Sequence, residues 1–361
     1  MNASRMIRGG VLIGTLASAW FNAGSARSAG PVVGWGLDNL EQASPPASVN
    51  GTSGTAIAIS GGYFNSCAIQ AGTGIVICWG DDSMGQSNPP ASVNGSSGTA
   101  TAIAAGGDSH ACAIQAGTSR VVSWGNDTND QATPPASVNG TSGTALAITT
   151  GQFHSCAIQS GTSAAVCWGS SNNGQAVPPN SVNGVSGTAS AVTAGYFHSC
   201  AIQSGTGAVV CWGSPLSGGT APAAVNGTGG TASAVSAGYF HTCAIRAGTD
   251  DVVCWGDPAH GNTTPPASVN GTSGTAVAIS AGGYHTCAIQ AGTGAAICWG
   301  SDFNGRATPP ASVNGTSGTA MAIATGGGHS LAIAAPEPTA IGLGTVSLGS
   351  MLALARRRRS R

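Results

Sequence analysis

The sequence predicts an all-β protein, a seven-bladed β-propeller in which the first strand of the chain completes the last blade. Trp-Gly recurs seven times, in steps of 43 to 45 residues, and a fixed period of this size indicates a solenoid or a propeller. A second marker, six histidines and one asparagine, recurs between the Trp-Gly pairs. The 58 glycines and 18 prolines among 361 residues favour many short strands joined by turns. The tryptophans are Trp35, Trp79, Trp124, Trp168, Trp212, Trp255 and Trp299, and the second marker occupies Asn65, His110, His154, His198, His241, His285 and His329.

Each period contains four short segments that alternate with turn residues. In the first period these segments are 47–49, 56–59, 66–71 and 75–80, separated by an Asn-Gly turn, a Gly-rich turn and a tight turn. Short apolar segments joined in this way are typical of antiparallel strands. We therefore expect one four-stranded antiparallel blade per period.

The two ends of the repeat region each hold half a blade. The region starts with a Trp-Gly strand at 32–36 and stops after a His-containing strand at 329–334. Pairing these two strands would remove two free sheet edges, which is how propellers avoid edge-to-edge association. The sequence therefore predicts a closed ring spanning residues 31–335.

The repeats resemble the regulator of chromosome condensation (RCC1) repeat. The resemblance is carried by Ala-Gly-Tyr-Phe-His-Ser-Cys-Ala-Ile at 194–202, by Val-Val-Cys-Trp-Gly at 209–213 and by Gly-Asp-Asp-Ser-Met-Gly-Gln at 80–86. It recurs along the whole of 31–335 and implies a seven-bladed propeller. The longer insertion usual in the family after the Gly-Gln turn is replaced here by Pro-Pro-Ala-Ser-Val-Asn-Gly, which leaves the outer strand of each blade open.

Residues 1–30 have the order of an export signal. Arg5 and Arg8 precede an apolar stretch at 11–21, and small residues follow, which places cleavage near Ala26. A buried N-terminal helix is the alternative, but the stretch is short and its charge order is that of a signal peptide. We expect a protein exported from the cytoplasm.

Residues 336–361 resemble the PEP-CTERM sorting signal of bacteria that make extracellular polysaccharide. Pro336, Glu337 and Pro338 precede an uncharged stretch at 339–355, and an arginine cluster at 356–359 follows. The resemblance implies recognition by an exosortase and removal of the tail, so the chain would contact the membrane only through this segment before processing. A permanent membrane anchor is the alternative. Both place the propeller in the bacterial cell envelope or extracellular matrix.

The charge of the repeat region excludes several classes of function. Residues 31–335 contain three arginines and eleven acidic residues, so a nucleic-acid partner is not expected. The chain has no lysine, which excludes a lysine nucleophile, and its glycine-rich turns lack the Gly-Lys-Ser/Thr ending of a phosphate loop. We expect no cofactor.

Ten of the eleven cysteines form five pairs with a separation of eleven residues. These pairs are Cys67 with Cys78, Cys156 with Cys167, Cys200 with Cys211, Cys243 with Cys254, and Cys287 with Cys298. Counting outward from a tight hairpin places each pair directly opposite, as a hydrogen-bonded pair with Cα atoms about 5.5 Å apart, within reach of a disulfide. Cys112 faces Ser123 and is expected to be a free thiol.

A metal site is the alternative use of the cysteines. His154, Cys156 and Cys167 would supply three ligands, but zinc sites normally have a closed fourth position, and no Cys-x-x-Cys spacing occurs. In an exported protein, disulfides are the favoured interpretation, and no metal is expected.

One face of the propeller is expected to be aromatic and acidic. In a meander of four strands, alternate turns lie on opposite faces, and every Tyr and Phe of 31–335 falls in turns of one face. The candidate binding residues on it are Tyr63, Phe64, Phe153, Tyr196, Phe197, Tyr239, Phe240, Tyr284, Phe303, Asp81, Asp82, Asp127 and Asp302. The rings could wedge between blades and the aspartates could favour turns. Alternatively, both could line a surface that recognises a polysaccharide or a basic protein.

No signature of an enzyme is present. His154 and Ser155 have the residue types of a base and a nucleophile, but adjacent strand residues point to opposite faces. The repeated histidine is interpreted as an inter-blade hydrogen-bonding residue, His260 as a loop histidine, and the Asn-Gly-Thr sequences as turns. We expect a non-catalytic, exported binding or scaffold protein. The alternatives are an inhibitor of a cell-wall enzyme of the penicillin-binding or β-lactamase type and, less favoured, a guanine-nucleotide exchange factor.

Overall fold

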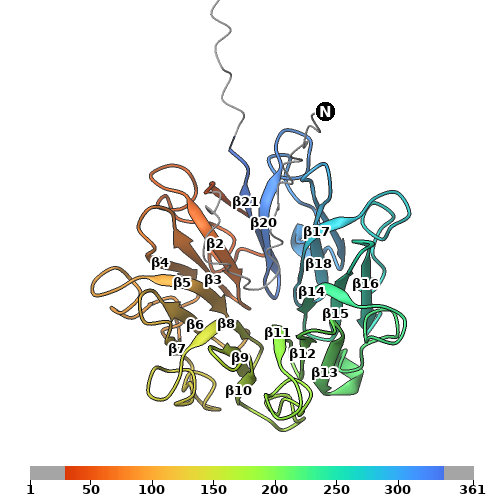
Figure 1. Ribbon diagram of the computed structural model, residues 1–361. Coiled ribbons are helices and arrows are strands. Elements are labelled where there is room, and N and C mark those ends of the chain that lie inside the picture. Colours follow the sequence, from red (N-terminus) through yellow and green to blue (C-terminus); the bar gives the residue numbers. More distant parts are fainter. Residues whose placement is uncertain (1–28, 337–361) are drawn as a thin grey trace, which may run out of the picture.

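The computed structural model describes residues 29–336 and confirms the seven-bladed propeller. Seven three-stranded antiparallel sheets are arranged as blades around a central axis (Figure 1). In the first complete blade, β2 (Ala56–Gly61) lies nearest the axis, β3 (Asn65–Gln70) is the middle strand and β4 (Val76–Gly80) is the outer strand.

The next five blades repeat this order. They are formed by β5 (Ala100–Ala105), β6 (His110–Gln115) and β7 (Val121–Gly125); β8 (Ala145–Thr150), β9 (His154–Gln159) and β10 (Ala165–Gly169); β11 (Ala189–Ala194), β12 (His198–Gln203) and β13 (Val209–Gly213); β14 (Ala232–Ala237), β15 (His241–Arg246) and β16 (Val252–Gly256); and β17 (Ala276–Ala281), β18 (His285–Gln290) and β19 (Ala296–Gly300). Two short 3-10 helices, η1 (Pro215–Ser217) and η2 (Phe303–Gly305), lie in loops after outer strands.

The ring closes as predicted. The last blade has the order β1-β21-β20, in which β1 (Val32–Gly36) pairs antiparallel with β21 (His329–Ala334), next to β20 (Ala320–Thr325). Gly30 adds a bridge to Ala56 of the first blade, with two backbone hydrogen bonds of 2.9 and 3.1 Å. The N-terminal strand therefore completes its own blade and is also attached to the neighbouring one.

The prediction of a fourth strand in each blade was wrong. The segment at 47–49 forms turns rather than a strand, and it follows the outer strand β1 of the closing blade instead of opening the next blade. It makes one backbone hydrogen bond to that strand, from Val32 N to Val49 O at 2.9 Å. The prolines at 45–46 have no N–H to donate, so a continuous ladder cannot form there. Val49 is nevertheless fully buried, and the segment covers the blade edge.

The hydrophobic core lies between blades rather than within them. Seven clusters each combine residues of two neighbouring blades. In one of them Cys67 and Ile69 of the first complete blade pack with Ile103 and Trp124 of the next. Each blade is thus stabilised by packing against both neighbours. Closure of the ring provides the first and last blades of the chain with their second neighbour.

The repeated histidine connects the blades, as predicted. His154 Nε2 lies 2.7 Å from Ser199 Oγ of the following blade, and Ser199 Oγ donates to the carbonyl of Gln175 at 3.0 Å. Trp212 Nε1 donates to the same carbonyl at 2.8 Å. Because Nδ1 of the histidine has no partner and the serine proton is already used, Nε2 carries the imidazole proton.

Six blade interfaces contain this histidine pair. The pairs are His110–Ser155, His154–Ser199, His198–Thr242, His241–Thr286, His285–Ser330 and His329–Ser66, with distances of 2.7 to 3.0 Å. At the seventh interface the equivalent positions hold Asn65 and Ala111, so the histidine and its hydroxyl partner are replaced together.

The predicted terminal signals lie mostly outside the described residues. This holds for residues 1–28 of the export signal and for the tail beyond Pro336, including Glu337 and Pro338. Within residues 29–336, no helix has the length and hydropathy needed to span a bilayer.

Candidate functional site

The turns between inner and middle strands place two consecutive side chains at one end of the propeller axis. In the first complete blade these are Tyr63 and Phe64, between β2 and β3. Glycine precedes them in every blade. A ring of backbone hydrogen bonds, present at six of the seven blade interfaces, links these turns, as from Tyr63 N to Gly106 O and from Gly327 N to Gly62 O. These hydrogen bonds hold the turns at the same level along the propeller axis, so their side chains leave the backbone at that level.

The aromatic side chains of these turns form one continuous cluster, which we call the aromatic face. It consists of Tyr63, Phe64, Phe153, Tyr196, Phe197, Tyr239, Phe240 and Tyr284, all partly exposed. Eight of the nine predicted aromatic residues are therefore brought together. Ring centroids of contacting pairs lie 4.1 to 6.4 Å apart, and most of these pairs fall within the roughly 4.5–7 Å range of favourable aromatic packing.

Three of these turns have a tyrosine at their first position, and the three tyrosines meet at the axis. Tyr63 and Tyr239 come from blades that are not adjacent, yet their rings stack at 5.7 Å with an interplanar angle of 8°. Tyr196 meets Tyr239 edge to face at 5.5 Å. Gly327 occupies the same turn position, and a Cβ atom there would lie 2.8 Å from the Tyr239 hydroxyl oxygen and 3.0 Å from a Tyr63 ring carbon. Glycine at this position therefore makes room for the stacked tyrosines.

The Tyr239 hydroxyl is buried without a hydrogen-bond partner, although part of the ring is exposed. Burial raises the pKa of Tyr239 well above its usual value, and the neighbouring Tyr63 acts in the same direction. The tyrosine is thus neutral and retains a proton to donate.

The aromatic residues at the second position of the turns lie alongside neighbouring tyrosines. Phe240 stacks on Tyr196 at 5.4 Å and approaches Tyr284 at 5.9 Å. Aromatic side chains from adjacent blades therefore support one another, which favours the wedge interpretation for their buried parts. Their exposed parts remain available as an apolar surface.

Phe303 is the predicted aromatic residue that does not join the aromatic face. It lies in η2, is 71% exposed and makes no ring contact with the described part of the chain. The next residue in this loop, Asn304, adopts a positive φ of 62°.

Two residues that the sequence did not assign to this site lie beside Tyr284. The His260 ring meets it edge to face at 4.7 Å, and the Arg306 guanidinium carbon lies 5.8 Å from its ring centre. Arg306 occupies the position of Gln86 in the Gly-Gln turn, and this departure from the repeat was the available signal.

Arg306 is a buried cation without an acidic partner among residues 29–336. The ion pair found in that part of the chain joins Arg246 and Asp251. Arg306 instead donates to the carbonyl of Ser301 at 2.9 Å, to the Ser301 hydroxyl and to the carbonyl of Gly327 at 3.4 Å. Burial lowers the pKa of Arg306, but with a usual value this high the group remains charged.

The four predicted aspartates are engaged in their own loops. Asp127 accepts hydrogen bonds from Ala132 N and from the Thr133 hydroxyl at 2.7 and 2.6 Å. Asp302 makes the equivalent pair with Ala307 N at 2.7 Å and the Thr308 hydroxyl at 2.7 Å. These contacts match the turn-forming alternative.

Asp81 and Asp82 follow the same pattern. Asp81 accepts from Ser83 N, the Ser83 hydroxyl and Gln86 Nε2 at 3.2, 2.9 and 2.6 Å, and Asp82 accepts from Ser87 N at 2.9 Å. Their carboxylates shape the loops and add negative charge around the aromatic face.

All five predicted disulfides are present, and their Cα separations are 4.0 to 4.1 Å. The register was predicted correctly, since Cys67 lies opposite Cys78. The prediction that each cysteine pair occupies a hydrogen-bonded position was wrong. Gln70 N bonds Ile75 O across the hairpin, so the cysteine pair falls at a non-hydrogen-bonded position, where Cα atoms lie closer together.

Cys112 has no disulfide partner and is buried opposite Ser123, whose hydroxyl contacts its sulfur at 2.9 Å. The alternative metal site is wrong: Cys156 and Cys167 are bonded to each other, and His154 Nε2 is used by Ser199. Residues 29–336 contain no other cluster of three potential metal ligands.

Comparisons with known proteins agree with this architecture. Residues 232–262 match the family model described as the regulator of chromosome condensation (RCC1) repeat. Yeast RCC1 (Prp20), in its complex with Kap60, superposes with a TM-score of 0.65 at 12% identity over 94% of this chain and 96% of that one. The fold is thus that of an RCC1-type repeat propeller.

Two plant receptor ectodomains are also similar. The entire ectodomain of the Physcomitrella patens receptor kinase CR4 is 26% identical over 69% of this chain, with a TM-score of 0.54, and the match spans 62% of that ectodomain. The CRINKLY WD40 ectodomain of Arabidopsis thaliana ACR4 is 22% identical over 76% of this chain and 91% of that one, with a TM-score of 0.55. No curated protein matches the sequence significantly.

Proposed function

We propose that the protein is an exported, non-catalytic recognition propeller whose aromatic face binds a protein partner at the cell surface or in the extracellular matrix. The observation that carries the proposal is the gathering of eight aromatic side chains at one end of the axis, each with an exposed part. Clustered aromatic residues at a surface favour protein interfaces.

The polar surroundings suit a partner with mixed charge. Loop aspartates around the aromatic face would attract basic groups, whereas the positive charge of the buried Arg306 beside Tyr284 would favour an acidic group nearby without direct contact. A protein partner can supply both together with apolar side chains. A polysaccharide is less favoured, because Tyr63 and Tyr239 stack on each other and Phe240 stacks on Tyr196, which covers ring faces that sugars would use.

The disulfides support export. Five of them form in residues 29–336, and disulfides persist in oxidising compartments. On this proposal, residues 1–30 direct export and the tail from Pro336 is processed by an exosortase. The similar Prp20 has been described in complex with Kap60 and with binding properties to Gsp1p and histones, which supports a propeller that binds proteins.

Buried histidines support a non-catalytic role. The six His–Ser or His–Thr pairs have the distance of a base and a nucleophile, but both side chains are fully or almost fully buried at blade interfaces. A substrate could not reach the hydroxyl oxygen without separating two blades.

The test measures binding of the purified mature protein to envelopes of the producing cells. Tyr196→Ala and Phe240→Ala should each weaken binding at least tenfold, and Val185→Ala, which removes an exposed apolar side chain at the other end of the blades, should not. Protease treatment of the envelope should abolish binding. Binding that survives protease but is lost after periodate oxidation would identify a polysaccharide, and equal binding by all variants would contradict the aromatic face.

A further inference from the structure

A cavity runs along the propeller axis behind the aromatic face. The inner strands of all seven blades line it, and its volume is about 170 Å³. One water molecule requires about 10–15 Å³ by this kind of measure, so the cavity has room for a small organic molecule. It is smaller than the roughly 300 Å³ at which pockets for drug-sized ligands begin.

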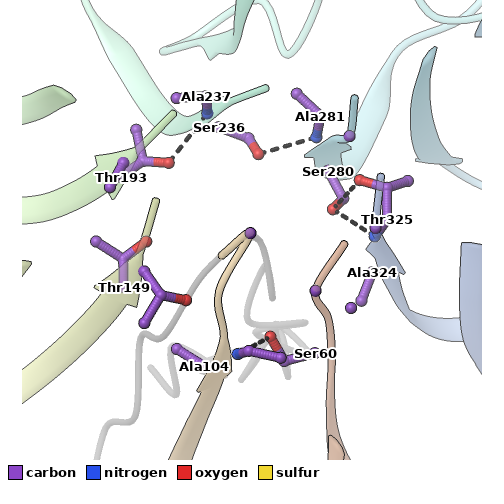
Figure 2. Close-up of a pocket in the computed structure, with 18 of the residues that line it drawn as sticks. Ser60, Ala104, Thr149, Thr193, Ser236, Ala237, Ser280, Ala281, Ala324 and Thr325 are labelled. Atoms are coloured by element: carbon purple, nitrogen blue, oxygen red, sulfur yellow. Dashed lines mark hydrogen bonds between the residues drawn. The ribbon is translucent and has the colours of Figure 1, made fainter. Parts of the chain in front are cut away.

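One level of the cavity wall is rich in hydroxyl groups (Figure 2). The equivalent position of each inner strand is filled by Ser60, Ala104, Thr149, Thr193, Ser236, Ser280 and Ala324. Five blades thus contribute a hydroxyl at the same height, and two contribute a methyl group.

These hydroxyl oxygens are held by the neighbouring blade. Ala237 N donates to Thr193 Oγ1 and Ala281 N donates to Ser236 Oγ, each at 3.0 Å (Figure 2). Ser60 Oγ accepts from Ala105 N at 2.9 Å. Because each oxygen accepts from a backbone N–H, the hydroxyl proton of these three side chains is left to donate.

The end of the cavity near the aromatic face carries two buried polar atoms without partners. Gln152 is 8% exposed, and its Oε1 atom is buried and accepts no hydrogen bond. The Tyr239 hydroxyl is likewise buried and unpartnered. Both residues line the cavity. An unsatisfied buried polar group costs about 1–3 kcal/mol, so each of these two groups would be stabilised by a hydrogen-bonding partner supplied by a ligand in the cavity.

The wall chemistry defines that partner. No charged side chain is among the described residues that line the cavity, which disfavours an ion. Gln152 Oε1 requires a donor, whereas the hydroxyls of Thr193 and Ser236 require acceptors. Alanine and isoleucine side chains provide apolar surface between them.

We propose that the axial cavity binds one neutral polyhydroxylated molecule, of monosaccharide size or smaller. A hydroxyl group both donates and accepts, so a polyol satisfies Gln152 and the hydroxyl level at once, while its C–H groups pack on the apolar wall. This site adjoins the aromatic face through Tyr239 but does not depend on the partner proposed for that face.

The test is isothermal titration of the mature protein with glycerol, D-glucose and D-galactose, followed by crystal soaking with the probe that binds. We expect saturable one-to-one binding of at least one probe, with density in contact with Gln152 and the hydroxyl level. Gln152→Leu and Ser236→Ala should each weaken that binding about 2- to 13-fold, the equivalent of one lost hydrogen bond.

Ser233→Ala is the control variant for Ser236→Ala. Ser233→Ala changes an exposed hydroxyl on the same strand as Ser236 and should leave affinity unchanged. Ser236→Ala is expected to fold, because Ala104 and Ala324 occupy the equivalent position in other blades. Absence of saturable binding by all three probes, with only ordered water in the cavity, would overturn the proposal, as would binding that none of the cavity variants weakens.

Discussion

His154 Nε2 lies 2.7 Å from Ser199 Oγ, and this contact joins two neighbouring blades. The pair recurs at six interfaces, and the seventh replaces both members, with Asn65 and Ala111. In five of the six pairs the hydroxyl also donates to a backbone carbonyl of the loop after the outer strand, so these pairs tie together a middle strand, the next middle strand and a loop. The histidine is therefore a structural element of the ring.

Removing one member of this pair should destabilise the protein more than replacing both. His154→Asn leaves the Ser199 hydroxyl without its donor and should lower the free energy of unfolding by about 1–3 kcal/mol. Adding Ser199→Ala reproduces the pair found at the seventh interface and should recover part of that loss. Urea unfolding of the two single variants and the double variant measures the coupling, and strictly additive effects would show that the two side chains do not interact.

The same histidines should make the fold sensitive to acid. Burial lowers the pKa of His154 and His198 to about 3 and of His110, His241 and His329 to about 4, and it lowers that of His285 as well. In the unfolded chain a histidine titrates near 6.5, so below that pH the unfolded state binds more protons. The stabilisation is complete above pH 6.5 and is lost as pH falls toward 4, at about 1.4 kcal/mol per pH unit for each histidine.

Urea midpoints between pH 7 and pH 4.5 measure this loss. The carboxylates titrate in both the parent protein and its variants. The informative quantity is therefore the difference between parent and variant in the slope of the free energy of unfolding against pH. His154→Asn should reduce the slope by about 1.4 kcal/mol per pH unit. Identical slopes in variant and parent would show that His154 is not a neutral, buried group.

The disulfides should contribute to stability through the unfolded chain. Each closes a hairpin between residues with a sequence separation of 11, for which the chain-entropy model gives at most about 3 kcal/mol. Replacing both Cys156 and Cys167 with alanine should therefore lower the free energy of unfolding by up to that amount. The blade formed by β5, β6 and β7 holds Cys112 opposite Ser123 at this position and shows that the hairpin can form without a disulfide. Unfolding that is unchanged in both the variant and the fully reduced parent would contradict a stabilising role.

Cys112 should be unreactive until the protein unfolds. The thiol is buried, and burial raises its pKa to about 11, so the nucleophilic thiolate is scarce at pH 8. Mass spectrometry after iodoacetamide treatment should find no modification of the native protein and one modified thiol in urea without reductant. Modification of Cys112 in the native protein would require an opening that the structure does not contain, and Cys112→Ser is the matched control.

The sequence determined the architecture, because the relevant contacts repeat with the period of the chain. The spacing of Trp-Gly and histidine markers set the number of blades and the pairing of β1 with β21, and hairpin counting set the register of Cys67 with Cys78. It also indicated that the histidines bridge blades. These are contacts within one hairpin or between equivalent positions of successive repeats, so counting along the chain is sufficient to find them.

Only the tertiary structure decided what meets at the axis. Tyr63 and Tyr239 lie in non-adjacent blades, and whether their rings stack depends on the width of the ring and on the glycine at position 327. The same holds for Arg306 beside Tyr284 and for the hydroxyls that share one level of the cavity. The period assigns each residue to a blade, but how far its side chain reaches across the axis follows from the curvature and packing of all seven blades together.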